Sequence, residues 1–328
     1  MNKRAFLRVA AGLGAAVGLS TRTGQTGAQA FPVRGLRIVV PYAPGGTSDI
    51  LARTLAVRVG ESIGQQIVVE NKPGANGALG SDLVAKSPPD GYTLLLTDVG
   101  GLTSAPALVP NLPFDPARDF APVTMIAFSP HLVVVNPNVS ARNLAELVAL
   151  AKSKKGGFNC ATVGAGSAPH LAAALFAKRA GLEWTYIPYK GGAQALNDMA
   201  SGQAEVMFNG MLATLPFVKN NRLRVVAVAS EQRWPSLTDV PTVAEQGYAG
   251  FVTGSWQGLL APAKTPPEAV ARLNAEFTRA LAVPDVAERL TAQGAEPRSM
   301  KPEQFAEFLR SDTAKWAQLV KETGIKAE

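Results

Sequence analysis

The stretch Leu36-Arg37-Ile38-Val39-Val40-Pro41-Tyr42-Ala43-Pro44-Gly45-Gly46-Thr47-Ser48-Asp49 leads from an apolar run into the start of a helical pattern. Residues 36–40 are apolar apart from Arg37, which is typical of a strand buried in a sheet. From residue 48 to 63, apolar residues recur on one side of a helix. A strand, a glycine-rich turn and a helix form the repeating unit of α/β folds, in which helices cover a parallel sheet.

The alternation of strands and helices continues along the chain and restarts at His131. Further strands are predicted at residues 67–69, 92–96, 132–135, 158–163, 184–189, 204–208, 223–229 and 256–260, and helices at 76–86, 143–153, 167–181 and 192–201. After residue 260 we expect no more strands, only three helices. These helices span 266–282, 284–292 and 302–323, each with a proline near its start.

We expect this helical tail to pack on the first domain, so that the chain crosses between domains twice, near residues 125–130 and 253–257. The sequence thus predicts two doubly wound α/β domains with a ligand cleft between them. The first domain would comprise residues 31–128 and 255–328, and the second 129–254. No internal sequence repeat relates the two halves.

The first thirty residues have the pattern of an export signal. Basic residues at Lys3, Arg4 and Arg8 precede an apolar run over 9–19, and Ala28-Gln29-Ala30 supplies small residues for a signal peptidase. The apolar run is shorter than the roughly 20 residues that a permanent membrane helix needs. We therefore expect a signal peptide over 1–30, cleavage near Ala30 and Phe31, and a periplasmic protein, with Sec and twin-arginine export both open.

Charge and composition exclude several function classes. The signal segment holds four basic residues and no acid, so its removal lowers the formal net charge from +7 to +3. No basic stripe with interleaved aromatic residues is present, so we expect no nucleic-acid partner. One cysteine and two histidines leave no material for a disulfide and little for a metal site. We expect neither a metal nor a cofactor.

Ligands of open α/β sheets bind beyond the carboxyl ends of the strands, so the loops that follow strands are the candidate site. The loop 41–49 combines glycines with a helix start, where free N–H groups and a partial positive charge favour anions. An ordinary tight turn with Thr47 or Ser48 as helix cap explains that loop equally well. The other candidate loops are 97–100, 164–170, 189–192 and 209–211.

Enzyme motifs are absent from the sequence. There is no Gly-Lys-Ser/Thr phosphate loop and no Gly-x-Ser-x-Gly elbow. Ser167 and His170 share one helix start, but no acid is identifiable to orient the histidine. Cys160 lies within a predicted strand, where a buried apolar role is favoured over a nucleophilic one. We expect no catalysis. A hydrolase or transferase using the same cleft is the weaker alternative.

The loops also carry a resemblance to a known family. They resemble the Bug/TctC receptors, the extracytoplasmic solute-binding components of tripartite tricarboxylate transporters. The resemblance covers essentially the whole mature chain and depends on many ordered motifs. These motifs are residues 40–49, 70–77, 89–95, 119–123, 166–171, 188–192, 237–242 and 256–259.

The resemblance implies a Venus-flytrap fold of the periplasmic binding protein type, with two crossovers. It implies a monomer that captures a small carboxylate and delivers it to the membrane permease subunits of a tripartite tricarboxylate transporter. A sensor that signals to a membrane kinase is an alternative. The implied ligand-binding residues are Tyr42, Ala43, Gly45, Gly46, Thr47, Asp49, Thr97, Asp98, Gly164, Gly166, Ser167, His170, Tyr189 and Asn209.

Two of these residues bear on which ligand is bound. Many relatives carry an acid where this chain has Asn209, and a neutral amide tolerates a further carboxylate. Asp49 either faces the cleft or only complements the dipole of the first helix, and the sequence leaves both roles open. The identity of the carboxylate is likewise open.

Overall fold

The structure is a computed structural model that describes residues 31–109 and 111–325. The predicted signal peptide, residues 1–30, lies outside the described residues. No helix in the described part of the chain is long and apolar enough to span a membrane.

The first sheet begins with the predicted strand–turn–helix unit. β1 (Leu36–Val40) pairs in parallel with β2 (Ile67–Asn71) and β3 (Thr93–Asp98), and β3 continues into an antiparallel pair with β9 (Gly254–Pro262). β9 in turn pairs antiparallel with β4 (Phe120–Val135), whose outer side takes the two-residue β10 (Glu296–Pro297).

Helices bury both faces of this first sheet, which is why β1 is apolar apart from Arg37. Leu36, Ile38 and Val40 pack toward α1 (Thr47–Ile63), α8 (Pro267–Leu281) and α9 (Pro284–Ala292). Val39 packs on the opposite side, toward α2 (Ala78–Ala85), α3 (Ala105–Leu108) and α10 (Pro302–Thr323). The short helix η1 (Ala75–Gly77) leads into α2.

The second sheet starts from the far end of β4. Its last residues, from His131 to Val135, pair antiparallel with β7 (Val206–Gly210) and β8 (Arg224–Val228). β7 pairs in parallel with β5 (Asn159–Thr162), which pairs with β6 (Thr185–Pro188). One face is covered by α4 (Leu144–Ser153) and α5 (Ala168–Ala180), and the other by α6 (Gly192–Ala200) and α7 (Met211–Lys219).

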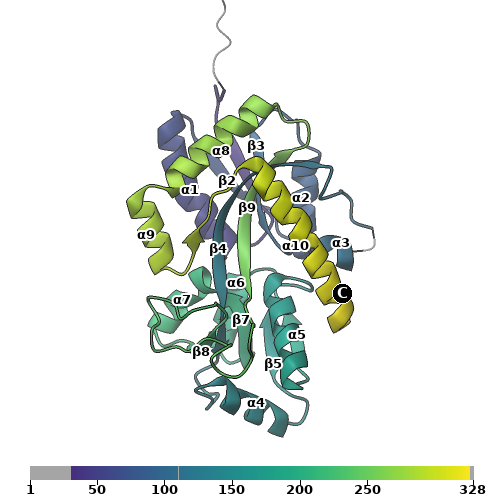
Figure 1. Cartoon of the computed structure of the whole chain (residues 1–328), viewed down its shortest axis with the longest axis vertical. Helices are drawn as coiled ribbons and strands as arrows, with labels where there is room; N and C mark the ends of the chain where they lie inside the picture. The colour runs from purple at the N-terminus through teal and green to yellow at the C-terminus, as the bar shows by residue number, and fades with distance from the viewer. Residues whose placement is uncertain (1–30, 110, 326–328) are drawn as a thin grey trace, which may run out of the picture. The chain divides into compact units, whose positions relative to one another are not determined.

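β4 is the structural link between the two sheets. Its first part pairs with β9 as far as Pro130, and its last five residues belong to the second sheet. β4 and β9 run side by side through the middle of the body (Figure 1). The chain therefore passes twice between the sheets, along two adjacent strands. The division into two domains at these crossings stays a prediction.

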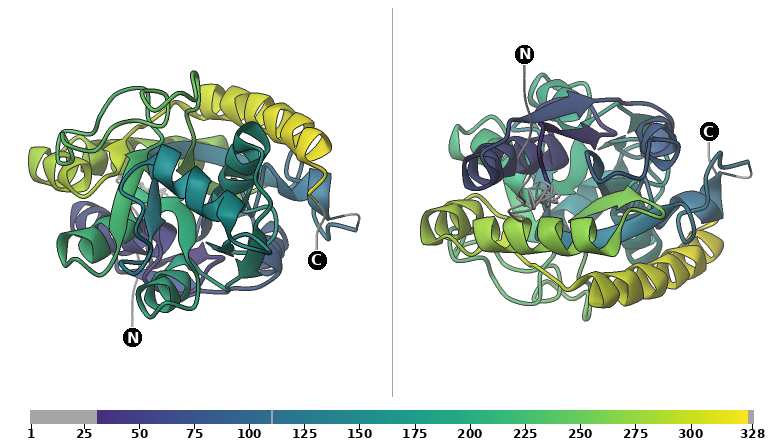
Figure 2. Two further views of the ribbon diagram at one scale, coloured as in Figure 1. Left: turned by 90° about the horizontal axis from the view of Figure 1, so that it is seen from below. Right: turned by 90° about the horizontal axis from the view of Figure 1, so that it is seen from above.

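The C-terminal helix α10 lies along the outside of the body (Figure 2). It contacts β4 and α3 and extends to α5 beside the second sheet. Lys178 Nζ, on α5, donates a hydrogen bond of 2.8 Å to the carbonyl of Glu322. The helical tail thus packs on the first sheet and also touches a helix of the second.

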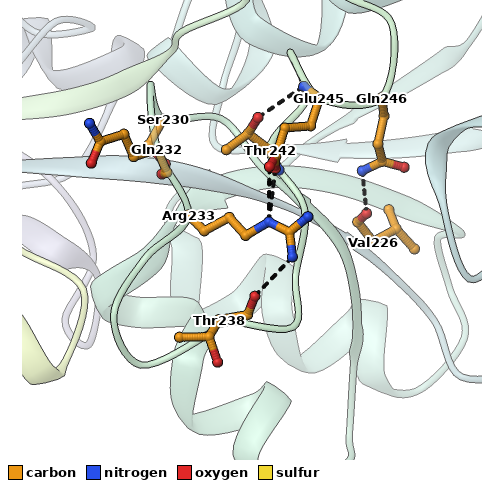
Figure 3. A network of polar contacts seen from close by, with 8 residues as sticks. All are labelled: Val226, Ser230, Gln232, Arg233, Thr238, Thr242, Glu245 and Gln246. Carbon is orange, nitrogen blue, oxygen red and sulfur yellow. Dashed lines mark hydrogen bonds and ion pairs between the residues drawn. The ribbon is translucent and has the colours of Figure 1, made fainter.

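The segment between β8 and β9 contains no helix and no strand among its described residues, and polar contacts hold it (Figure 3). Arg233 Nε contacts both carboxylate oxygens of Glu245 at 3.0 Å, and Arg233 donates to the carbonyl of Thr238 over 3.1 Å. Glu245 also accepts from the Thr242 amide at 2.6 Å, and Gln246 Nε2 donates to the Val226 carbonyl at 2.9 Å.

The α/β fold and most predicted elements match the structure within a few residues, with three corrections. The sheets are mixed rather than parallel, because β4 and β9 run antiparallel to their neighbours. Strands do not stop after residue 260, because β10 returns to pair with β4. The first part of β4, together with α3 and α7, was not predicted.

Candidate functional site

Four helices begin around one small cavity with a volume of about 40 Å³. Residues from the N-terminal ends of α1, α5, α6 and α7 form much of its wall. The lining residues are Tyr42, Gly46, Thr47, Ser48, Asp98, Val163, Pro169, Gly191, Gly192, Asn209, Gly210, Ala213, Ser255 and Gln257. Since roughly 10–15 Å³ of such space holds one water, the cavity matches a few waters or one carboxylate group.

The loop before α1 is held by Asp49. The Gly45 amide donates to Asp49 over 2.9 Å, and Arg53 Nε and Asn71 Nδ2 donate to the same carboxylate over 3.0 and 2.9 Å. Asn71 Nδ2 also donates to the Tyr42 carbonyl at 3.0 Å. Burial opposes ionisation of Asp49, but hydrogen bonds from Arg53, Gly45 and Asn71 outweigh it and lower the carboxyl pKa. Asp49 is not among the lining residues.

The loop before α5 is also held from within. The hydroxyl of Ser167, the N-cap, donates to the Gly164 carbonyl over 2.8 Å and accepts from the His170 amide. His170 Nδ1 accepts from the Gly166 amide at 3.0 Å, and burial lowers the His170 pKa to about 4. Ser167 and His170 therefore shape this helix start, and neither lines the cavity.

The starts of α6 and α7 approach the loop of α1 closely. A Cβ atom on Gly191 would lie 2.8 Å from Ala43 Cβ, and one on Gly210 would lie 2.9 Å from Thr47 Oγ1. Asn209, which lines the cavity, donates from Nδ2 to Thr214 Oγ1 at 3.0 Å. These contacts bring backbone from both sheets to one small space.

Tyr42 and Asp98 form a hydrogen-bonded pair in the cavity wall. The Tyr42 hydroxyl donates a hydrogen bond to Asp98 Oδ1, which also accepts from the Gly100 amide at 3.0 Å. Tyr42 in turn accepts from the Gly101 amide at 2.9 Å. Burial raises the Asp98 pKa to about 6, although these hydrogen bonds lower it. Burial and the neighbouring Asp98 raise the Tyr42 pKa.

Gln257 is a site residue that the sequence analysis missed. Its side chain on β9 is fully buried and lines the cavity, and neither its amide nitrogen nor its amide oxygen has a hydrogen-bond partner. A buried amide without partners is costly, so such a group in a cavity wall is expected to bind something there. Gln257 sits in an apolar-looking strand, and only the structure places it opposite Asp98 in the β3–β9 register.

Ser255 also lines the cavity and contacts a histidine, as a nucleophile would. Its Oγ lies 3.2 Å from His131 Nε2, and His131 Nδ1 lies 3.1 Å from Thr253 Oγ1. The third group is a hydroxyl rather than a carboxylate, and burial lowers the His131 pKa to about 3. Such an imidazole is a weak general base at neutral pH, so this arrangement favours binding over nucleophilic chemistry.

A larger cavity of about 460 Å³ shares Tyr42 and Val163 with the small one. Tyr189, Lys190 and Asn76 are among its lining residues, and the buried Asn76 Oδ1 has no hydrogen-bond partner. The two cavities together offer a small polar end and a wider extension. No group of histidine, cysteine and acidic side chains able to hold a metal occurs in the described residues.

The structure separates the predicted site residues into three groups. Lining the small cavity are Tyr42, Gly46, Thr47, Asp98 and Asn209. Gly164 and Tyr189 line the larger cavity, as does Tyr42. Lining neither cavity are Ala43, Gly45, Asp49, Thr97, Gly166, Ser167 and His170. Ser48, Gly192 and Gly210 line the small cavity from loops predicted as candidates, and Ser255 and Gln257 line it from outside those loops.

Mixed sheets joined by adjacent strands, with helix starts converging on a cavity, define the α/β class of periplasmic binding proteins. A solved periplasmic binding protein, BugD, superposes with a TM-score of 0.87 and 34% identity, over 91% of this chain and all of that chain. Residues 51–325 match the family model described as "Tripartite tricarboxylate transporter family receptor". The chain belongs to this receptor family.

Curated relatives cover nearly the whole chain. A protein encoded in the tcbD-tcbE intergenic region of a Pseudomonas species is 38% identical over 317 residues, spanning 95% of this chain and 94% of that protein. BugT of Bordetella pertussis is 37% identical over 304 residues, spanning 91% and 92%.

Two similar structures contain carboxylate ligands. A protein of R. palustris solved with adipate is 35% identical, with a TM-score of 0.87 over 91% of this chain and all of that chain. MatC of Rhodopseudomonas palustris, solved with bound malate, is 34% identical, with a TM-score of 0.83 over 88% of this chain and all of that chain.

Proposed function

We propose that this receptor captures a small carboxylate, with one carboxylate group in the cavity where α1, α5, α6 and α7 begin. The observation that carries the proposal is the convergence of these four helix starts, since each carries a partial positive charge. The glycine N-caps of α1 and α6 leave first-turn amides without a side-chain cap, whereas at α5 Ser167 binds the His170 amide and Pro169 has no N–H. No lysine or arginine lines this cavity. Peptide dipoles, rather than a salt bridge, would therefore hold the anion.

The rest of the ligand would extend into the larger cavity past Tyr42 and Val163. There, Tyr189 and Asn76 offer polar groups and Lys190 offers a cation. The adipate and malate found in two similar structures support a ligand with a second polar end. Among the predicted site residues that line neither cavity, Asp49, Ser167 and His170 would shape the helix starts without touching the ligand.

In this proposal the mature protein starts near Phe31, works in the periplasm as a monomer, and passes its ligand to membrane permease subunits without changing it chemically. Residues 31–128 with 255–328 would move as one domain and 129–254 as the other, hinged at the two crossings. The weak base His131 beside Ser255 supports binding without catalysis.

The test is a thermal-shift screen on protein recovered from the periplasm. The panel contains adipate, malate and other small mono-, di- and tricarboxylates, each beside its amide or alcohol counterpart. A true ligand at a hundred times its Kd stabilises the fold by roughly 2.7 kcal/mol. We expect carboxylates alone to raise the melting temperature. If no carboxylate does so, or if amides do so equally, the proposal is wrong.

Two further measurements use the same preparation. Intact mass should place the mature N-terminus at or near Phe31, and a protein retaining Met1 would contradict export with cleavage. Solution scattering should show a smaller radius of gyration when a ligand from the screen is added to an open unliganded state. An unchanged radius from such a state would contradict the hinge.

A further inference from the structure

We propose that the Asp98 side chain is protonated, and therefore neutral, when it binds the ligand carboxylate. Each ligand is then captured together with one proton from solvent. This inference rests on the proposed function and adds a condition to it. It concerns how a site without a cation receives an anion beside an acidic side chain.

The geometry makes Asp98 the decisive group. It is the only aspartate or glutamate lining the small cavity, and no lysine or arginine lines that cavity. The hydrogen bonds from Tyr42 and from the Gly100 amide both end on Oδ1, and a backbone hydrogen bond from Gly101 also lowers the carboxyl pKa. A proton on Oδ2 would turn the carboxyl into a donor for a ligand oxygen. An ionised Asp98 would instead place two carboxylates in a space that holds a few waters.

The other walls around Asp98 are uncharged. Thr47 and Ser48 face the cavity from α1, Pro169 from α5, Gly192 from α6 and Asn209 from β7. Gln257 lies opposite on β9 with a neutral amide that lacks partners. None of these groups offsets a second negative charge.

The nearby titratable groups do not supply a compensating charge either. Tyr42 is a phenol whose pKa is raised, so it stays neutral. Burial lowers the pKa of His131, behind Ser255, to about 3 and that of His170 to about 4, so both rings are neutral at pH 7. Lys190 is exposed and lines the larger cavity, and the Arg53 guanidinium is bound to Asp49.

The Asp98 carboxyl is already close to the required state. Burial raises the Asp98 pKa to about 6, and an adjacent ligand carboxylate raises it further, because two like charges at close range disfavour each other. Above pH 6 the free receptor is mainly ionised at Asp98, so binding takes up a proton. Below pH 6 the proton is already present. Affinity for a carboxylate should therefore fall as the pH rises above about 6, approaching tenfold per pH unit.

Isothermal titration calorimetry tests this on the mature protein, with adipate, malate and each carboxylate that is positive in the screen. Titrations at pH 7.5 in HEPES and in Tris, which differ in ionisation enthalpy, give the protons taken up. We expect between half a proton and one, and a Kd that rises about tenfold from pH 7 to pH 8. Asp98→Asn should bind at both pH values with no proton uptake. The exposed Asp285→Asn should behave like the parent protein.

A second variant keeps the test decisive if Asp98→Asn fails to fold. Tyr42→Phe removes a hydrogen bond that lowers the Asp98 pKa, so the fall in affinity should begin at a higher pH. Carboxylate binding with no proton uptake and no pH dependence in the parent protein would overturn the inference while leaving the proposed function intact. Failure of every carboxylate to bind between pH 5.5 and 8 would contradict the proposed function itself.

Discussion

The backbone amide of Gly45 donates a 2.9 Å hydrogen bond to the carboxylate of Asp49, four residues later in the chain. The same carboxylate accepts from Asn71 Nδ2, and Asn71 also donates to the Tyr42 carbonyl. One buried acid therefore ties β2 to the loop that opens α1. The loop is shaped before any ligand arrives, which reduces the ordering cost of binding.

Replacing Asp49 by alanine should weaken both the fold and the site. The variant leaves the Gly45 amide and the Asn71 amide without their acceptor, at a cost of about 1.5–3 kcal/mol of unfolding free energy. We expect carboxylate affinity to fall about tenfold, because the α1 start loses its fixed position. Chemical denaturation and calorimetry measure the two effects.

Asp49→Asn is the matched control, since its amide oxygen can still accept from Gly45. It should lose less stability than Asp49→Ala. Tighter carboxylate binding in Asp49→Ala, with an unchanged melting temperature, would show instead that Asp49 faces the ligand and repels it.

Asp49 should also make the stability of the fold depend on pH. Its folded-state pKa is lowered, mainly by Arg53, Gly45 and Asn71 acting against burial. The stabilisation is therefore present above the unfolded pKa of about 3.9 and lost as the pH falls through the lower folded value. Thermal melts from pH 6 to pH 2.5 should show a steeper acid loss for the parent protein than for Asp49→Asn.

Two glycines in facing loops should differ sharply in their tolerance of a methyl group. A Cβ on Gly191 would lie 2.8 Å from Ala43 Cβ, whereas a Cβ on Gly46 would meet nothing nearer than the Ala43 carbonyl oxygen at 3.8 Å. Gly191→Ala should therefore separate the two loops and raise the Kd for a carboxylate at least tenfold. Gly46→Ala should bind within about threefold of the parent protein. Equal affinities would mean that these loops do not need to touch for binding.

Asp312 should be the most important acid for the C-terminal helix. Its Oδ2 accepts from Thr103 Oγ1 at 2.7 Å, Trp256 Nε1 at 2.7 Å and Trp316 Nε1 at 2.8 Å. Asp312→Ala leaves these buried donors without that acceptor and should cost at least about 2 kcal/mol of stability. Tryptophan fluorescence should change in parallel. A variant as stable as the exposed control Asp285→Ala would contradict this role.

Glu245 should control local order rather than binding. Its carboxylate joins the Thr242 amide to the Arg233 guanidinium within the segment between β8 and β9 (Figure 3). Glu245→Ala should increase hydrogen exchange at residues 238–246 without changing carboxylate affinity. Glu307→Ala, which breaks the exposed pair with Arg310 on α10, is the matched control and should leave that segment unchanged. Altered affinity in Glu245→Ala alone would connect the segment to the site.

Elements with a clear apolar period could be predicted from the sequence, including helices with a proline in their first turn, whereas the first part of β4 and α7, which have prolines in their interior, were not predicted. β1 and α1 follow their patterns nearly residue for residue. The first part of β4 contains Pro122 and Pro130, and proline argues against a central strand because it lacks a donor. β4 accommodates Pro122 beside an irregularity in its register with β9. α7 likewise contains Pro216.

The candidate site was predictable where a loop follows a strand and opens a helix, as at Gly46 and Asp98. Gln257 was not, because its significance lies in two polar atoms without partners, a property of the folded surroundings alone. The sequence also could not distinguish the role of Asp49 from that of Asp98. Both are acids in glycine-containing loops, but only the contacts show one satisfied within its loop and the other facing the cavity.

The four helix starts at the small cavity have a consequence for how such a site changes over generations. Every amino acid except proline supplies a backbone N–H, so few point mutations remove one. Substitutions at Tyr189, Lys190 or Asn76 would therefore change which ligand is accepted in the larger cavity, while the backbone groups of the small cavity would still bind the carboxylate group. A receptor built this way can acquire a new nutrient by altering a few wall residues, without first losing its capacity to bind an acid.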